Sequence, residues 1–372
     1  MSEPLSKIPN GTRYYFGREA RLRRSVEQIV MSVFDGWSYE EITTPTVDYY
    51  SLFEHGMGRS QAHRAFRFTD TDGRLLALRP DVTSGVARAA VTIFADRDRP
   101  LRLCYAAPVF RQQPQSHVEW RRESTQTGCE LIGANTSVAD MEVLAVASEI
   151  LQNLGLGHNY QITLNDVGIV KGIAAGHALD EVSRDEMRQL VDSRNAPDLE
   201  RFLAHHGFVP EDRCALTQLT RLSGKRETLE RGRRLIPNAG SREALDRLDS
   251  LWSMIESLDL ADRFEIDLGE VARLDYYTGL TFNIYVNGAA SRVGNGGRYD
   301  GLTAAFGKAE PAVGFVLDLD ALTTVLLALE VDVRLPKESE PQMSVVTNSD
   351  PTLLFCEARK KRAEGECVLI KL

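Results

Sequence analysis

The sequence predicts an α+β fold in which an antiparallel-rich sheet is flanked by helices. Paired extended runs surround turn residues, as in "RAFRFTDTDGRLLALRP" around Asp72-Gly73, and this is typical of hairpins. Helical stretches stand between such pairs without the strict strand–helix alternation of a parallel sheet. A charged, helix-periodic segment at 167–261 then interrupts the strand-rich parts, which resume at "RFEIDLGEVARLDYY".

Taken in order, the first element expected is an amphipathic helix over residues 12–35, because Val26, Ile29, Val30 and Val33 share one face. Gly36-Trp37 ends this helix. The stretch "YEEITTPTVDYY" follows as a strand that Pro45 breaks.

After the hairpin at 64–80, residues 81–93 predict a helix with Asp81 or Thr83 as its N-cap. "LRLCYAAPVFRQ" and "ESTQTGCELIGA" predict two strands around a polar loop. Ser137 to Asp140 resembles a capping box and opens a helix that reaches Leu154.

These elements predict three units. The core domain comprises 1–166 and 262–330, the helical insertion comprises 167–261, and 331–372 form a short C-terminal strand–helix–strand unit. The last unit is too small to fold on its own.

Composition limits the class of protein. The chain has 372 residues, 43% of them hydrophobic and 26% charged, with a net charge of −9. We expect a cytoplasmic protein without a membrane segment, because the sequence contains no long apolar run, no signal peptide and an odd number of cysteines, five, without a C-x-x-C pair. The acidic balance argues against a general nucleic-acid binder.

The stretch "GNGGRYDGL" at 294–302 frames Arg298 and Tyr299 with glycines. It fits neither a dinucleotide fingerprint nor a phosphate loop. The simplest interpretation is a hairpin loop that needs positive φ angles. The alternative is a thin backbone beside a ligand, with large polar side chains around it.

Two other stretches present polar side chains at strand ends. Asp81 in "LRPDVT" either caps a helix or offers a carboxylate to a ligand ammonium group. Arg111 in "PVFRQQ" ends an apolar strand and needs an anionic or carbonyl partner.

The strand "STQTGCELIG" places Gln126 and Glu130 four residues apart, so that both side chains point to one face of the sheet. That face is either solvated or lines a binding site. No third ligand accompanies His205-His206, so this pair is interpreted as surface and no metal site is expected. No nucleophile or protease motif occurs.

Together and in order, these stretches resemble the catalytic domain of class II aminoacyl-tRNA synthetases, in the histidyl branch. The first helix, Gly36-Trp37 and Pro45 resemble the first, dimer-forming motif. "PVFRQQ…RRESTQTGCELIG" resembles the second motif and "PAVGFVLDLDAL" (311–322) the third. "LRPDVT", "RLDYYTG" and "GGRYDGL" resemble the stretches that build the histidine pocket.

The chain departs from active members of that branch where they bind ATP. Ala272 stands where an arginine assists activation of the carboxylate, and the neighbouring Arg273 would face the opposite side of a strand. Ala321 replaces the arginine of the third motif, with Asp318 in place of a glycine. Gln113 replaces a glutamate that touches adenine. The resemblance therefore implies no catalytic residue and no cofactor.

The amino-acid pocket is retained. Asp81 would meet the α-ammonium group, Arg111 the carboxylate, and Glu130 with the tyrosine hydroxyls the imidazole nitrogens. By resemblance, the histidine-binding residues are Asp81, Thr83, Arg111, Gln126, Glu130, Tyr276, Tyr277 and Tyr299.

A chain of this length without the ATP arginines or an anticodon-reading domain resembles the regulatory subunits of ATP phosphoribosyltransferase. The resemblance implies a short-form catalytic subunit as partner, a self-dimer through the first-motif region, a hetero-oligomer that is typically octameric, and L-histidine as the feedback effector of histidine biosynthesis. It implies no tRNA. Two alternatives stay open: a degenerate synthetase that adenylates an amino acid, and a histidine-binding module for another partner.

Overall fold

The computed structural model describes residues 6–112, 121–236, 238–270, 277–331, 333 and 343–371, without the side chain of Ser60. Within them, a main sheet of nine strands has the order β1-β5-β6-β12-β11-β10-β7-β9-β8. Every pair is antiparallel except β1–β5 and β7–β9. The strands are β1 Glu40–Glu41, β5 Leu101–Phe110, β6 Glu123–Ile132, β12 Ala312–Asp318, β11 Gly294–Arg298, β10 Leu280–Val286, β7 Tyr160–Asp166, β9 Phe264–Asp267 and β8 Ser223–Gly224. The predicted fold class is confirmed.

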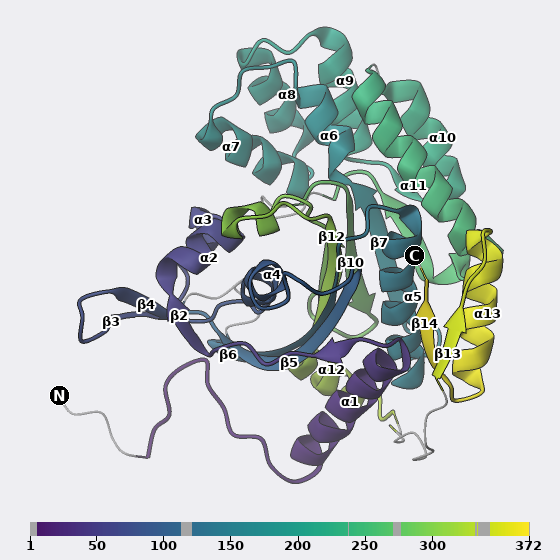
Figure 1. The fold of residues 1–372 in the computed structure, drawn as a ribbon. Coiled ribbons are helices and arrows are strands. Elements are labelled where there is room, and N and C mark those ends of the chain that lie inside the picture. Colours follow the sequence, from purple (N-terminus) through teal and green to yellow (C-terminus); the bar gives the residue numbers. More distant parts are fainter. Residues whose placement is uncertain are drawn as a thin grey trace.

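Helices α1 (Gly17–Gly36), α5 (Ser137–Asn153) and α12 (Leu319–Ala328) pack with the middle strands around the main hydrophobic core. The sheet curves around α4 (Thr83–Val91) on its other side (Figure 1). As predicted, α1 buries Val26, Ile29, Val30 and Val33, because one apolar stripe faces the core. The segment ends at Gly36, followed by buried Trp37.

A small three-stranded sheet follows α1 in the chain. Its order is β2 (Val47–Tyr49), β4 (Leu75–Leu78) and β3 (Arg67–Thr69), and β3–β4 is the predicted hairpin. Helices α2 (Tyr50–Met57) and α3 (Arg59–Ala62) lie between β2 and β3 in the chain. Pro45 separates β1, in the main sheet, from β2, so the predicted broken strand contributes to two sheets.

Two predicted N-cap positions are wrong by one residue. The N-cap of α4 is Val82, which makes no side-chain cap, and the Asp81 carboxylate instead accepts a hydrogen bond from Ser84 Oγ. The N-cap of α5 is Thr136, whose hydroxyl accepts from the Ala139 amide at 3.2 Å. Asp140 binds a distant arginine instead of closing a capping box.

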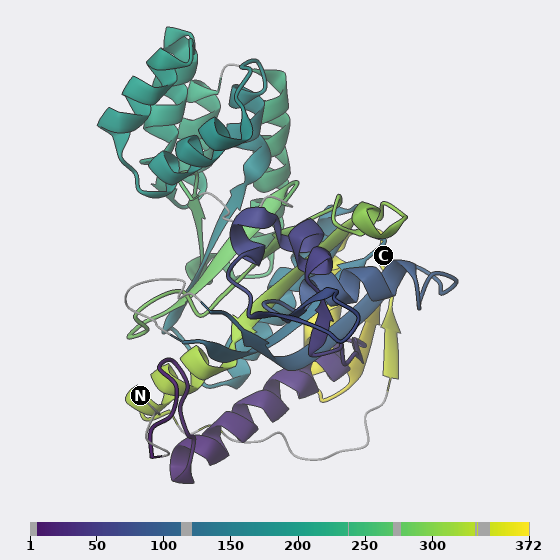
Figure 2. The same ribbon diagram turned by 90° about the vertical axis from the view of Figure 1, so that its left-hand side faces the viewer.

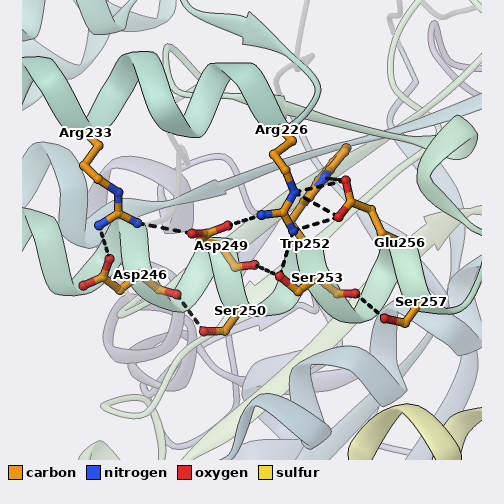
Figure 3. Close-up of polar contacts among 9 residues, drawn as sticks. All are labelled: Arg226, Arg233, Asp246, Asp249, Ser250, Trp252, Ser253, Glu256 and Ser257. Atoms are coloured by element: carbon orange, nitrogen blue, oxygen red, sulfur yellow. Dashed lines mark hydrogen bonds and ion pairs between the residues drawn. The ribbon is translucent and has the colours of Figure 1, made fainter.

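The charged middle segment forms a helical lobe that projects from one end of the main sheet (Figure 2). Arg226 and Arg233 of α10 reach across to carboxylates of α11, among them Asp249 and Glu256 (Figure 3). These ion pairs are largely exposed, so they hold the two helices weakly. The helices are α6 Val167–Ala174, α7 Glu181–Asp192, α8 Ala196–His205, α9 Pro210–Leu219, α10 Arg226–Leu235 and α11 Ala239–Ser257, followed by the short 3-10 helix Ala261–Arg263.

The chain closes with β13 (Met343–Val346), α13 (Pro351–Ala363) and β14 (Cys367–Ile370), the predicted strand–helix–strand order. This unit is tied to the core in two places. Phe355 packs against Trp37 with ring centroids 6.4 Å apart. Arg102, ion-paired at 2.8 Å with the fully buried Glu142, also donates to the Ile370 carbonyl at 2.8 Å.

Among the helices of the described residues, none has the length and apolarity needed to cross a membrane. The division into three domains stays a prediction.

Candidate functional site

The central strands carry a cleft with a cavity volume of about 410 Å³, floored by β6, β10, β11 and β12. Its lining includes every histidine-pocket residue expected from the sequence, except Tyr276. Tyr276 and the substituted position Ala272 lie outside the described residues, as do Arg273 and Gln113. The predicted residues that line the cleft are Asp81, Thr83, Arg111, Gln126, Glu130, Tyr277 and Tyr299.

Strand alternation brings Gln126 and Glu130 of β6 to the same wall of the cleft, as the spacing predicts. Gly128, between them, pairs with Tyr105 of β5. A Cβ at Gly128 would lie 2.9 Å from the Tyr105 hydroxyl oxygen, so the glycine leaves room for that ring.

Glu130 is the centre of a buried polar network. Tyr299 donates a short hydrogen bond to its Oε2, and Tyr105 donates to its Oε1 at 3.1 Å. The Tyr105 hydroxyl also lies 3.3 Å from Thr83 Oγ1. Burial raises the pKa of Glu130 to about 7, although the hydroxyl donors lower it.

Tyr105 belongs to this site although sequence reasoning missed it. It sits in a largely apolar strand and is itself 1% exposed. The available signal was its polar hydroxyl within a fully buried run, which requires a partner.

Asp81 presents an unpartnered oxygen at the cleft. Its Oδ2 accepts from Ser84 at 3.1 Å, whereas its Oδ1 is buried and has no hydrogen-bond partner in the described part of the chain. Burial raises the pKa of Asp81 to about 6, against the lowering effect of Ser84 and of the Arg111 charge. Arg111 donates through Nε to the Pro80 carbonyl at 3.0 Å. An ammonium group would satisfy the free oxygen.

The interpretation of 294–302 as a hairpin loop is wrong. Gly294–Arg298 forms β11, paired on both sides within the sheet. Its glycines serve close approach: a Cβ at Gly296 would lie 2.5 Å from the Gly314 carbonyl oxygen. A Cβ at Gly314, on β12, would lie 1.9 Å from Glu130 Oε2. The thin floor therefore makes the space that the carboxylate occupies.

Arg298 and Tyr299 point in different directions. Tyr299 reaches Glu130, but Arg298 leaves the cleft and pairs with Asp140 at 2.7 Å. Arg298 therefore fixes the end of β11 against α5 and does not line the cleft.

Tyr277 forms the side of the cleft next to the insertion. Its hydroxyl accepts a hydrogen bond from Asn295 Nδ2 at 3.3 Å, and its carbonyl accepts from Lys171 Nζ of α6 at 2.6 Å. The insertion is thus in direct contact with one of the predicted pocket residues.

The third-motif segment forms β12 and α12. Ala321 lies in the first turn of α12, where its amide donates to Asp318 Oδ1 at 2.8 Å. Asp318 lines the cleft and pairs with Arg121 at 3.5 Å. A carboxylate and a methyl group therefore stand at the two positions where the resemblance to active synthetases leads us to expect a glycine and an arginine.

No cluster of three or more His, Cys, Asp or Glu side chains suited to a metal occurs in the part of the chain that the structure describes. His205 is exposed at the end of α8, and the His206 ring lies 2.9 Å from the Phe202 carbonyl oxygen.

The fold and the cleft define a histidyl-tRNA synthetase-like domain. The family profile described as histidyl-tRNA synthetase matches residues 11–322. A solved structure described as an ATP phosphoribosyltransferase regulatory subunit/histidyl-tRNA synthetase from Bacillus halodurans is similar, with a TM-score of 0.79 and 28% identity. That similarity covers 100% of this chain and 93% of the other.

Curated relatives define the family more narrowly. An ATP phosphoribosyltransferase regulatory subunit of Moorella thermoacetica is 34% identical over 98% of this chain and 92% of its own length. A regulatory subunit of the same description from Desulfitobacterium hafniense is 32% identical over 97% of this chain and 91% of its own length. The chain belongs to the family of ATP phosphoribosyltransferase regulatory subunits. It is accordingly a non-catalytic subunit of an enzyme complex, as the substituted residues led us to expect.

Proposed function

We propose that this chain binds L-histidine in the cleft, activates the short-form catalytic subunit of ATP phosphoribosyltransferase and transmits feedback inhibition to it. The observation that carries the proposal is the pair of buried carboxylates. Asp81 offers an unpartnered oxygen to an ammonium group, and Glu130 is set between hydroxyls for an imidazole. The same lining disfavours a nucleotide triphosphate, because its five carboxylates, Asp318 among them, outnumber its three arginines.

Histidine fits this cleft chemically. Its α-ammonium group would pair with Asp81, its carboxylate with Arg111, and its ring nitrogens with Glu130 and a tyrosine hydroxyl. Tyr276 belongs to the same proposed set. Coupling to the catalytic subunit requires histidine to bind two states of the complex with different affinity.

The assembly is part of the proposal. We expect a self-dimer through the first-motif region, α1 and the segment to Pro45, within a cytoplasmic hetero-oligomer of octameric type. All five cysteines are free thiols, which suits a reducing compartment. We expect no binding of tRNA.

The decisive experiment assays the catalytic chain with and without this subunit, across a histidine titration. We expect a higher rate with the subunit and inhibition by histidine only in its presence. The variant Glu130→Gln should keep the activation and lose the inhibition. The matched control Glu243→Gln, an exposed residue of α11, should behave like the parent chain. If the rate and the inhibition by histidine are the same with and without the subunit, the assignment is rejected.

Amino-acid activation is the competing function, since the similar solved structure carries both names. Exchange of pyrophosphate into ATP in the presence of histidine separates the two. Loss of one preorganised charge stabiliser costs a factor of about 10² to 10³ in rate, so two losses should abolish exchange. Robust exchange would contradict the interpretation of Ala272 and Ala321. A histidine-binding module for another partner would bind histidine yet leave the phosphoribosyltransferase unaffected.

A further inference from the structure

A second cavity, with a volume of about 560 Å³, lies between the insertion and the core. Helices α6 and α7 and the segment between them form one wall, and Asn165, Glu270 and Tyr277 contribute from the core. Figure 1 shows α7 at the edge of the lobe that is nearest the core. Val170 and Met187 are buried apolar parts of the lining. The size and the apolar walls are those of a small-molecule site.

Three cations converge on this cavity. Lys171 comes from α6, and Arg184 and Arg188 come from successive turns of α7. Burial and the Arg188 charge lower the pKa of Lys171, against the raising effect of Asp166. The lysine as a whole is exposed, but its amine is held against the Tyr277 carbonyl.

The lining also contains two carboxylates, Glu181 and Glu270, against these three cations. Glu270 accepts hydrogen bonds from Thr163 and, at 2.7 Å, from Tyr285. Glu181 lies one turn before Arg184, yet Arg184 forms no ion pair within the described residues. Arg188 pairs with Asp185, which lies outside the lining, and His177 pairs with Asp212 at 3.2 Å.

We propose that this cavity binds a phosphate ester with an apolar or aromatic body. Arg184, Arg188 and Lys171 would hold the phosphate, because guanidinium groups match its oxygens in pairs and a dianion suits several cations better than a carboxylate does. Val170, Met187 and the Tyr277 ring would contact the body of the ligand.

The cavity also reaches the histidine cleft, because Tyr277 and Glu270 line both. A phosphate that attracts the Lys171 amine competes with the Tyr277 carbonyl, which that amine contacts at 2.6 Å. Releasing this contact loosens Tyr277, so the ester lowers the affinity for histidine, and histidine lowers the affinity for the ester equally. This second step rests on the proposed function, whereas ester binding does not.

The test uses the full chain with phenyl phosphate as the probe, and titration calorimetry measures its binding. We expect binding of phenyl phosphate, weaker binding of inorganic phosphate and none of neutral benzyl alcohol. Arg184→Ala should lower the affinity for phenyl phosphate at least about fivefold, since one charged hydrogen bond contributes about this factor or more to binding. Arg234→Ala is the matched control, an exposed arginine of α10 outside the cavity, and should leave the affinity unchanged.

Three results would overturn the site: no binding of phenyl phosphate at millimolar concentration, equal binding of inorganic phosphate, or equal affinity in Arg184→Ala. Thermal unfolding of each variant identifies a folding defect, and Lys171→Met then supplies an independent loss of charge. Repeating the histidine titration with saturating phenyl phosphate tests the coupling, for which we expect at least a fivefold loss of histidine affinity. Unchanged histidine affinity rejects the coupling alone, and absent histidine binding rejects the proposed function instead.

Discussion

Tyr299, which directly follows β11, donates a hydrogen bond to Glu130 of β6 across the floor of the cleft. Both side chains are 2% exposed. A carboxylate so deeply buried keeps its charge only at an energetic cost, which a cationic or hydrogen-bonding ligand can offset.

Replacing Glu130 with glutamine should stabilise the free protein at pH 8 while weakening histidine binding. Burial raises the pKa of Glu130 from 4.5 to about 7, so its contribution favours folding at low pH and is lost as pH rises through about 7. Glutamine cannot ionise, so the variant avoids this loss, which amounts to about 1–3 kcal/mol in the free energy of unfolding. Thermal unfolding between pH 4 and 8 measures it. A variant that is less stable than the parent chain at pH 8 would contradict the prediction.

Histidine affinity should fall as pH decreases from 7.5 to 5. The pKa is raised to about 6 in Asp81 and to about 7 in Glu130, so both carboxylates of the empty cleft take up protons in this range. Protonated, they no longer attract the cationic groups of the ligand. Calorimetry at several pH values tests this, with Asp81→Asn as the control that should show a shallower dependence. An affinity independent of pH would exclude both carboxylates from the site.

Gly314→Ala should damage the cleft. The added Cβ would lie 1.9 Å from Glu130 Oε2 and 2.4 Å from the Cys129 carbonyl oxygen, so the floor must shift. We expect destabilisation of about 1–3 kcal/mol and loss of histidine binding.

Gly301→Ala is the matched control for this change, because a Cβ there meets no atom within 4 Å. Its free energy of unfolding should change by at most about 0.5 kcal/mol. Chemical denaturation compares the two variants, and equal effects would show that the close approach at Gly314 does not matter.

Tyr105→Phe should weaken histidine binding roughly tenfold, because it removes a hydroxyl that donates to Glu130 at 3.1 Å. Since that hydroxyl lowers the pKa of Glu130, its loss should also move the pH dependence of binding to higher pH. A shift toward lower pH, measured by the same titrations, would mean that Tyr105 has no part in setting the charge of Glu130.

The sequence predicted most of the cleft because a period of two decides which strand residues share a face. Gln126 and Glu130 therefore lie on one wall, as expected. The glycine-rich stretch left two interpretations open, since local rules cannot distinguish a turn glycine from one that allows another strand to approach closely. Gly296 shows the missing information, because the Gly314 carbonyl oxygen that it approaches belongs to a different strand, β12.

The predictions of the N-cap positions were wrong for a similar reason. Asp140 has the spacing of a capping box, but a buried arginine, Arg298, offers it a stronger partner than a backbone amide does. The role of Tyr105 depends on Thr83 of α4 and Glu130 of β6, which only the packing of that helix on the sheet brings within reach of its hydroxyl.

The link between Arg102 and the Ile370 carbonyl has a consequence for the protein as it is made. Strand β5, which carries Arg102, leaves the ribosome long before residue 370 does. Until residue 370 has emerged, the Arg102 side chain can pair with Glu142 but lacks its hydrogen bond to the Ile370 carbonyl. Folding of the core during synthesis can start early but is completed only when this final strand has emerged.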